Sequence, residues 1–229
     1  MSEYDPFAPI YDQWSEHMTE DVPFYVDLAR EADGPIVELA VGTGRVAIPV
    51  ARETGKRVVG IDRSAAMLAV ARERAAEAGV DLDLREQDMR DFELDEAAAL
   101  VYSPFRSLLH LPTWGDKRCV FDRVAASLQP NGRFAWNAFV FDHAIASRLH
   151  GQHQEKPVPH TIRQAPHESR VDLELDSGSK TSLWWATKNE WLGLIEVAGL
   201  EVEALYGDFE YGAFDKDSRE FVWVARKPG

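Results

Sequence analysis

The chain has 229 residues, of which 45% are hydrophobic and 28% charged, a composition typical of a folded globular domain with a sizeable core. Its formal net charge of −14 opposes binding to a phosphate backbone or an anionic membrane, so we expect a small-molecule partner and neither nucleic acid nor membrane. Cys119 is the only cysteine, which excludes an intrachain disulfide and fits a cytoplasmic protein.

The first segment, MSEYDPFAPIYDQWSEH, is acidic and lacks the basic and apolar parts of a secretory signal. No apolar run in the sequence reaches the roughly 18 residues that a membrane span needs. Residues 6–32 predict two helices, interrupted near Pro23. We therefore expect residues 1–32 to form a helical cover on the domain that follows.

Strand-like and helix-like segments alternate in the middle of the chain. The predicted strands are residues 35–40, 57–62, 80–88, 98–105 and 133–140. The predicted helices are residues 44–54, 64–79 and 114–128, and the segment QPNG after the last of them predicts a turn. Ser64 and Gly79 are suitable caps for the second of these helices. Alternation of this kind favours a parallel, doubly wound sheet.

The end of the chain follows a different pattern. Residues 187–199 predict a helix, and residues 200–207 and 219–227 predict a hairpin, so the last strand should be antiparallel. Residues 141–186 predict an insertion that contains a second hairpin, with its turn at Ser177 and Gly178. We therefore predict one α/β domain over residues 1–229: a doubly wound, mostly parallel seven-stranded sheet with an antiparallel last strand, an N-terminal helical cover and a β-hairpin insertion that acts as a substrate-side lid.

The stretch PIVELAVGTGRVAIPV, residues 35–50, carries a strand directly into a glycine turn and then into a helix. Gly42 and Gly44 would let backbone N–H groups approach a ligand that a Cβ would block, and the start of the helix offers further N–H groups. Asp62 ends the second strand, where a carboxylate can accept hydrogen bonds from two ribose hydroxyls. Asp88 ends the third strand, where it can accept one from an adenine amine. These strand ends together predict an adenosine site.

Two other interpretations of the glycine turn stay open. The segment GTGRVA also fits the dinucleotide pattern G-x-G-x-x-A, so an NAD(P)-dependent oxidoreductase is one alternative, although the antiparallel last strand does not supply a second mononucleotide half. The other is a tight turn beside solvated acidic residues that binds nothing. Soaking with each cofactor discriminates between these interpretations.

The same segments resemble the motifs of the class I, Rossmann-like S-adenosylmethionine-dependent methyltransferases of the small-molecule type, over nearly the whole chain. VELAVGTGR is similar to their first motif, VVGIDRSAAML to the ribose-binding segment and LREQDMRDF to the adenine-binding turn. SPFRSLLHL resembles the segment after the fourth strand, and LQPNGRFAWNAF the turn and fifth strand. Ala40 departs from the first motif, which commonly has glycine there. The resemblance implies S-adenosyl-L-methionine as the cofactor and methyl transfer to a small-molecule N or O nucleophile.

The resemblance also implies a place for each cofactor-binding residue. Glu38 would hold the methionine ammonium directly or through water, and Asp62 the ribose. Asp88 and the N–H of Met89 would meet the adenine, and Tyr11 would fold over the methyl donor or, alternatively, fix the N-terminal helix to the core. The full implied cofactor set is Tyr11, Glu38, Ala40, Gly42, Gly44, Asp62, Arg63, Met67, Asp88, Met89, Ser103 and Pro104.

Methyl transfer from a sulfonium needs mainly alignment and desolvation, because the leaving group is already activated. The catalytic candidates are His110 and Tyr11. His110 is the best candidate for a general base. Alternatively, His110 only packs in the core. We expect Phe105, His110, Asn137 and Trp184 on the substrate side. Trp184, Trp185 and Trp191 would form either an apolar wall over the substrate or ordinary core and hairpin packing.

Five histidines fall between residues 143 and 167, but no clustered cysteine or carboxylate completes a metal-ligand set, so we expect no metal. A macromolecular methyltransferase is disfavoured by the charge. A non-catalytic protein that keeps the fold is a further alternative. The sequence is compatible with a monomer or a homodimer.

Overall fold

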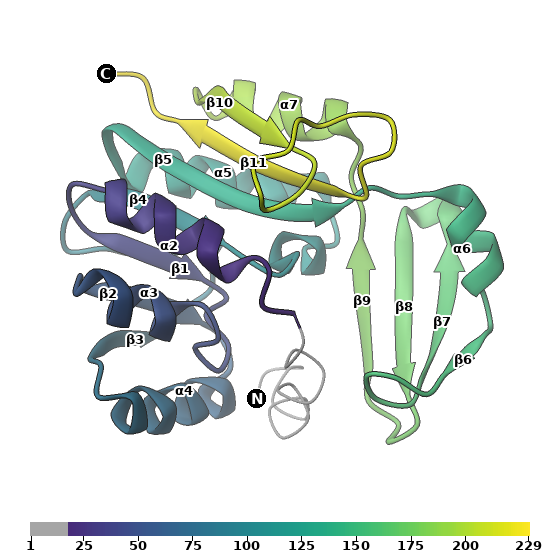
Figure 1. Cartoon of the computed structure of the whole chain (residues 1–229). Helices are drawn as coiled ribbons and strands as arrows, with labels where there is room; N and C mark the ends of the chain where they lie inside the picture. The colour runs from purple at the N-terminus through teal and green to yellow at the C-terminus, as the bar shows by residue number, and fades with distance from the viewer. Residues whose placement is uncertain (1–17) are drawn as a thin grey trace.

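Seven strands form the central sheet of the computed structural model, which describes residues 18–229 (Figure 1). Their spatial order is β10-β11-β5-β4-β1-β2-β3. The strands are β1 (Ile36–Leu39), β2 (Val58–Asp62), β3 (Leu82–Glu86), β4 (Ala98–Ser103), β5 (Leu128–Phe139), β10 (Glu201–Tyr206) and β11 (Glu220–Arg226). The pairs among β1 to β5 are parallel, and β11 is antiparallel to both β5 and β10. The predicted sheet and its antiparallel last strand are therefore confirmed.

Helices cover both faces of this sheet (Figure 1). One face carries α2 (Val22–Glu31), α3 (Ala47–Thr54) and α4 (Ala65–Ala78), and the other carries α5 (Trp114–Ser127) and α7 (Lys188–Val197). Every residue of β1, β2 and β4 is buried, as expected for parallel strands between two helical layers. Of the two helices predicted over residues 6–32, the second is α2, which begins at Val22 and has Pro23 in its first turn; residues 6–17 of the first lie outside the described residues.

Local sequence explains where the helices begin and end. The Ser64 hydroxyl accepts a hydrogen bond from the Met67 N–H at 3.2 Å at the start of α4, and Gly79 ends this helix in the left-handed conformation. Thr187 and Glu190 form a capping box at the start of α7. The predicted turn at QPNG is wrong as a separate element, because β5 begins at Leu128, directly after α5, and absorbs these residues in an irregular start with Asn131 at a φ of 63°.

The insertion at residues 141–186 folds into a helix and a second sheet. The helix is α6 (His143–Leu149), and the sheet contains β6 (His153–Gln154), β7 (His160–Ala165), β8 (Arg170–Leu175) and β9 (Lys180–Trp184) in that order, all antiparallel. The predicted hairpin is confirmed as β8 and β9, with Gly178 in the left-handed conformation between them. The sequence did not reveal α6, β6 or β7.

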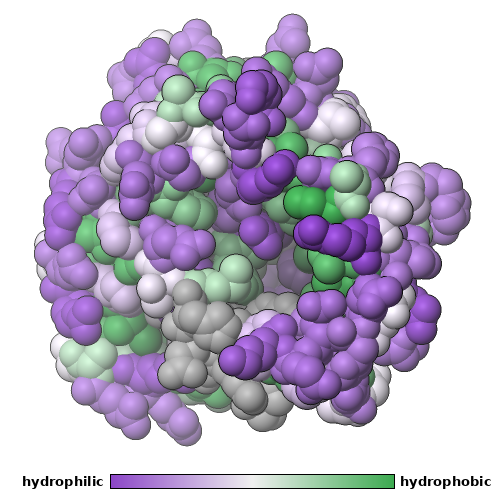
Figure 2. Space-filling model, turned by 45° about the vertical axis from the view of Figure 1, so that its right-hand side comes forward, coloured by the Kyte–Doolittle hydropathy of each residue, from purple (hydrophilic) through white to green (hydrophobic). Residues whose placement is uncertain are grey.

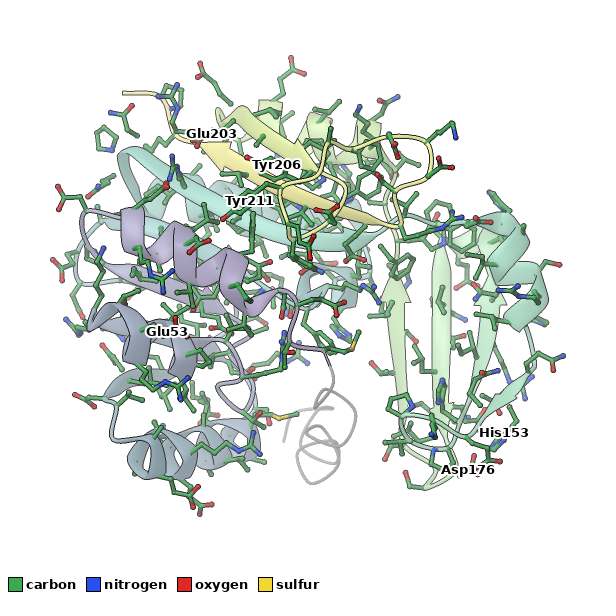
Figure 3. The ribbon with its side chains drawn as sticks, in the orientation of Figure 1. Glu53, His153, Asp176, Glu203, Tyr206 and Tyr211 are labelled. Carbon is green, nitrogen blue, oxygen red and sulfur yellow. The ribbon has the colours of Figure 1, made fainter. Side chains whose placement is uncertain are left out.

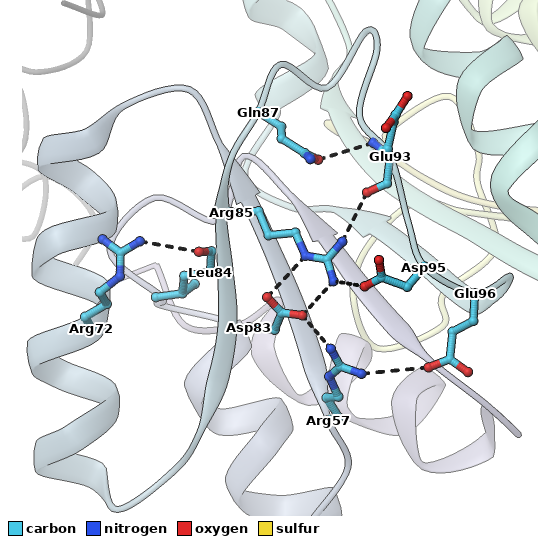
Figure 4. A network of polar contacts seen from close by, with 9 residues as sticks. All are labelled: Arg57, Arg72, Asp83, Leu84, Arg85, Gln87, Glu93, Asp95 and Glu96. Carbon is cyan, nitrogen blue, oxygen red and sulfur yellow. Dashed lines mark hydrogen bonds and ion pairs between the residues drawn. The ribbon is translucent and has the colours of Figure 1, made fainter.

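The β3 edge of the large sheet carries an ion-pair network rather than an open row of apolar side chains (Figure 4). The Arg85 guanidinium donates to Asp83 and Asp95, and Arg57, the residue before β2, also donates to Asp83. Hydrogen bonds from Arg85 and Arg57 lower the pKa of Asp83, so this carboxylate is charged at neutral pH. A charged edge of this kind opposes pairing with another strand.

Candidate functional site

The carboxyl ends of the parallel strands lie at one edge of the sheet, and β1 and β4 are neighbours there although they are distant in sequence. This is the point at which strand order reverses, where open α/β sheets bind their ligands. The short helix η2 (Ser107–His110) follows β4 at this edge, and the insertion reaches it because Thr181 of β9 lies beside His110. Figure 2 shows a hollow in this face, with hydrophobic residues in its walls.

The glycine turn between β1 and α3 is fixed by the carboxylate that ends β2. The Gly42 N–H donates to Asp62 Oδ2 at 2.9 Å, and the Ser64 N–H donates to Asp62 Oδ1 at 2.8 Å. Burial raises the pKa of Asp62, while these backbone N–H groups lower it. Each carboxylate oxygen has a second lone pair, so Asp62 can still accept hydrogen bonds from two hydroxyls.

Left-handed backbone conformations shape this turn. Gly42 and Gly44 have φ angles of 56° and 82°, and a Cβ on Gly44 would meet Ile48 at 3.0 Å. Ala40, which stands where the first methyltransferase motif commonly has glycine, has a φ of 55°. Alanine is therefore strained at this position, whereas glycine would not be.

Arg45, directly after the turn, is tied to the start of α2. Its guanidinium donates two hydrogen bonds of 2.6 Å to the Asp21 carboxylate, and a third of 2.5 Å to the Met18 carbonyl. The Phe105 ring lies 4.9 Å from the same guanidinium. The sequence analysis did not predict these hydrogen bonds, because Asp21 lies 24 residues before Arg45 and no local pattern joins the two residues.

Glu38 of β1 is a buried carboxyl group with an unsatisfied oxygen. Its side chain is 1% exposed, and among residues 18–229 neither its Oε2 nor the Tyr102 hydroxyl beside it has a hydrogen bond of ordinary geometry. Burial raises the pKa of Glu38 to about 8, against the lowering effects of Tyr102 and Arg45. Buried polar groups without partners are uncommon in folded proteins, so these two atoms fit a polar ligand group such as an ammonium.

Asp88 is already engaged by its neighbour. The Arg90 backbone N–H and guanidinium both donate to the Asp88 carboxylate, at 3.0 Å and 2.6 Å, and hydrogen bonds from Arg90 lower the pKa of Asp88. Arg90 also donates to Asp116 at 2.9 Å. Arg63 lies 3.9 Å from Asp88 with an exposed side chain, Met89 is partly buried and Met67 is buried.

His110 lies in η2 at the boundary between sheet and insertion. Its Nδ1 is 3.4 Å from the Thr181 hydroxyl, and burial lowers its pKa to about 4. His110 is therefore neutral at physiological pH and accepts or donates hydrogen bonds without holding a positive charge. The Ser103 hydroxyl, at the end of β4, is buried and has no partner among residues 18–229.

The remaining substrate-side residues have mixed environments. The carboxamide of Asn137 accepts hydrogen bonds from the Tyr25 hydroxyl and the Arg106 N–H and donates to Glu220, so it is occupied by protein groups. Trp184, at the end of β9, is partly buried and lies opposite Arg170 in the strand register. Trp191 belongs to the core with Phe121 and Trp136, which excludes it from a wall over the substrate. Tyr11 lies outside the described residues.

The histidines of the insertion do not gather around one point. His153 contacts Asp176 at 3.1 Å at the far tip of the insertion sheet, as Figure 3 shows, whereas the His160 Nδ1 donates to the Val158 carbonyl at 2.7 Å. Across residues 18–229, no three histidine, cysteine or acidic side chains are placed to hold a metal ion. In the same part of the chain, no helix has both the length and the apolar character to cross a bilayer.

Comparison with known proteins points to one family. Residues 36–132 match the methyltransferase domain family. The chain is 31% identical over 142 residues to the methyltransferase GfsG of Streptomyces halstedii, covering 58% of this chain and 46% of that protein. It is 23% identical over 239 residues to the putative methyltransferase GWCH70_2453 of a Geobacillus strain, covering 95% of this chain and 93% of that protein.

A third relative carries a more specific description. The chain is 35% identical over 97 residues to a dTDP-3-amino-3,6-dideoxy-alpha-D-glucopyranose N,N-dimethyltransferase of Streptomyces fradiae, covering 42% of this chain and 36% of that protein. Its match, like that to GfsG, spans less than half of the relative's own length.

Solved structures share the fold over the whole chain. The CcbJ methyltransferase of Streptomyces caelestis superimposes with a TM-score of 0.82 and 24% identity, covering 100% of this chain and 99% of that one. Other structures of the same fold include methyltransferases of an amino pentose, a sugar nitrogen and a glycopeptide nitrogen, each below 25% identity, two of them with S-adenosylmethionine bound. Likeness at this level of identity establishes the fold.

Proposed function

We propose that this chain, which carries a methyltransferase domain with the class I S-adenosylmethionine-dependent fold, transfers a methyl group from S-adenosylmethionine to a nitrogen or oxygen nucleophile of a small molecule. S-adenosylmethionine is the methyl donor that this family uses. The observation that carries the proposal is the set of polar groups at the β1–β4 edge: the unsatisfied Glu38 carboxyl, the glycine turn and the Asp62 carboxylate that holds it.

In this assignment each group binds a different part of the cofactor. Glu38 takes the methionine ammonium, and Asp62 accepts from the ribose hydroxyls. The N–H groups of Gly42 and Gly44 already donate to Asp62 and to the Val41 carbonyl, so these glycines contribute a turn without side chains rather than donors to the cofactor. Asp88 reaches the adenine amine only with an oxygen lone pair that Arg90 leaves free. When bound, the cofactor supplies an electrophilic methyl group on a good leaving group, and the protein contributes alignment and a dry site.

A nitrogen nucleophile fits the site better than a hydroxyl. An alcohol needs a base to remove its proton, and the pKa of His110, lowered by burial to about 4, makes this residue a weak one. A neutral amine needs only to be aligned and requires no base. The match to an amino-sugar N,N-dimethyltransferase supports the same choice.

We assign the insertion to the acceptor side of the site. Thr181 of β9 lies beside His110, and Leu183 packs on the hydrophobic core next to η2, so the second sheet borders the carboxyl edge of β4. Phe105 and Trp184 are assigned to the same side. We further assign the protein to the cytoplasm, as a monomer or homodimer.

Calorimetry with S-adenosylhomocysteine and with NAD tests the cofactor assignment. We expect micromolar-range binding of the former and none of the latter, and saturable NAD binding without a response to S-adenosylhomocysteine would support the oxidoreductase instead. A screen of amine and alcohol metabolites with S-adenosylmethionine, read by mass shift, then tests transfer. Binding of the cofactor without turnover of any acceptor would favour a non-catalytic protein.

A further inference from the structure

Two consecutive residues at the carboxyl end of β4 have backbone conformations that side chains disfavour. Phe105 has a φ of 57° and Arg106 a φ of 62°, and neither is glycine. Such conformations persist only where the surroundings hold them, and they concentrate at functional sites. This strained turn lies where β4 leaves the sheet beside β1, at the reversal of strand order.

A partly buried polar network holds the turn in place. The Arg106 N–H donates to Asn137 Oδ1 at 3.2 Å, and its guanidinium donates to both oxygens of Glu220, at 3.1 Å and 2.8 Å. Asn137 Nδ2 donates to the same Glu220 at 2.6 Å, and the Tyr25 hydroxyl donates to Asn137 at 3.3 Å. We call Tyr25, Arg106, Asn137 and Glu220 the Arg106 clamp; it joins α2, the turn, β5 and β11.

The clamp determines where Phe105 points. Because Arg106 is anchored to β5 and β11, the preceding residue projects toward the glycine turn, and its ring lies 4.9 Å from the Arg45 guanidinium. Arg45 is in turn fixed by two hydrogen bonds to Asp21. Phe105 therefore contacts Arg45, the residue after the glycine turn, and lies two residues before η2, which carries His110.

We infer that Arg106, Asn137 and Glu220 are positioning residues, which hold Phe105 as a fixed wall between the methyl-donor and acceptor parts of the site. This inference rests on the proposed methyl transfer. The clamp side chains hydrogen-bond one another and the turn, and they act through Phe105. In-line transfer depends on alignment, and a displacement of about 1 Å can cost roughly 100-fold in rate. The side chain of Glu220 is 12% exposed, so its charge is well shielded and its loss should loosen the turn.

The test compares Glu220→Gln with a matched control at the opposite end of β11. There Arg226 donates to Asn131 and Glu201, an arginine–asparagine–glutamate group of the same composition, so Glu201→Gln is the control. Hydrogen exchange is measured on the peptide that spans residues 104–107, with and without S-adenosylhomocysteine. Glu220→Gln should accelerate exchange there at least tenfold, and Glu201→Gln should leave it at the wild-type rate.

Kinetics separate positioning from simple support of the fold. With an amine acceptor found by the metabolite screen, Glu220→Gln should lower kcat at least tenfold, while the Kd for S-adenosylhomocysteine stays within threefold and Glu220→Asp recovers part of the rate. If melting shows that Glu220→Gln is unfolded, Arg106→Lys replaces it, because lysine keeps the charge but loses the two-point contact.

The outcomes distinguish the clamp from the proposed function. Wild-type exchange at residues 104–107 in a folded clamp variant overturns the inference, whether or not an acceptor is known. Faster exchange with an unchanged kcat overturns the positioning role. If the wild-type protein does not bind S-adenosylhomocysteine, the proposed function is refuted. The positioning role in that reaction is then refuted as well.

Discussion

Binding of S-adenosylhomocysteine should release a proton from Glu38. Burial raises the pKa of this carboxyl to about 8, so about nine-tenths of the ligand-free protein carries the proton at pH 7. The charged and titratable groups around it are Tyr102 on β4, Arg45 after the glycine turn, Asp21 at the start of α2 and Asp62 at the end of β2. A ligand ammonium placed against Glu38 favours the carboxylate, so about 0.9 protons should leave per ligand bound.

The same pKa fixes the sign of the pH dependence. Because only the ionised form of Glu38 pairs with the ammonium, affinity should be about ninefold higher at pH 7 than at pH 6. The free energy of unfolding of the ligand-free protein depends on pH with the opposite sign. The unfolded chain releases the Glu38 proton near the ordinary value of 4.5, before the folded protein does, so the free energy of unfolding should fall as pH rises from 4.5 to about 8.

Calorimetry in two buffers of different ionisation enthalpy measures the released proton directly. The wild-type protein should show buffer-dependent heats with S-adenosylhomocysteine at pH 7, and Glu38→Gln should not. Methylthioadenosine, which lacks the amino-acid part of the ligand, serves as the matched control and should release no proton from either protein. Buffer-independent heats with the wild-type protein, or equal release from Glu38→Gln, would refute the reasoning.

Substitutions at three positions test other parts of the site. Asp62→Asn should weaken S-adenosylhomocysteine binding at least tenfold by calorimetry, and Asp62→Ala should also lower the free energy of unfolding by about 2 kcal/mol, because the N–H groups of Gly42 and Ser64 lose their acceptor. Ala40→Gly should raise the free energy of unfolding by about 0.5–1 kcal/mol in urea, because glycine adopts a φ of 55° without strain. His110→Gln should lower kcat less than tenfold and leave the pH–rate profile unchanged above pH 5, because the histidine is already neutral there.

At each of these three positions, one outcome would contradict the prediction. Unchanged affinity of folded Asp62→Asn for S-adenosylhomocysteine would mean that Asp62 does not bind the ribose. A loss of stability in Ala40→Gly would mean that the alanine methyl packs favourably enough to outweigh its strain. A pH–rate limb near about 6.5 that disappears in His110→Gln would restore this histidine as a general base.

The alternation of strand-like and helix-like segments was sufficient to predict the main sheet. β1 (IVEL) and β2 (VVGID) are short, mostly apolar segments that lead into turns, and the burial of every residue in them fits a parallel sheet covered on both faces. The proximity of Gly42 and Asp62 followed as well, because parallel strands end at the same edge, and a 2.9 Å hydrogen bond joins these two residues.

The first half of the insertion, with α6, β6 and β7, and the long-range ion pairs could not be predicted from the sequence. β7 contains no regular alternation of apolar and polar residues, and β6 has only two residues, so neither gives a periodic signal. Asp21 with Arg45, and Arg106 with Glu220, are pairs whose members lie 24 and 114 residues apart. Such pairs depend on how layers pack, and periodicity within one element carries no information about them.

Transfer of a labelled methyl group tests the central proposal most directly. The protein is incubated with S-adenosylmethionine that carries a deuterated methyl group and with a library of small amines and alcohols, and products are read by mass spectrometry beside Asp62→Asn as the control. The proposal predicts an acceptor whose nitrogen carries the deuterated methyl group, together with an equal amount of S-adenosylhomocysteine. Both products should be strongly reduced in the variant. Cofactor that binds but is never demethylated, with no labelled product from any amine or alcohol, would contradict it.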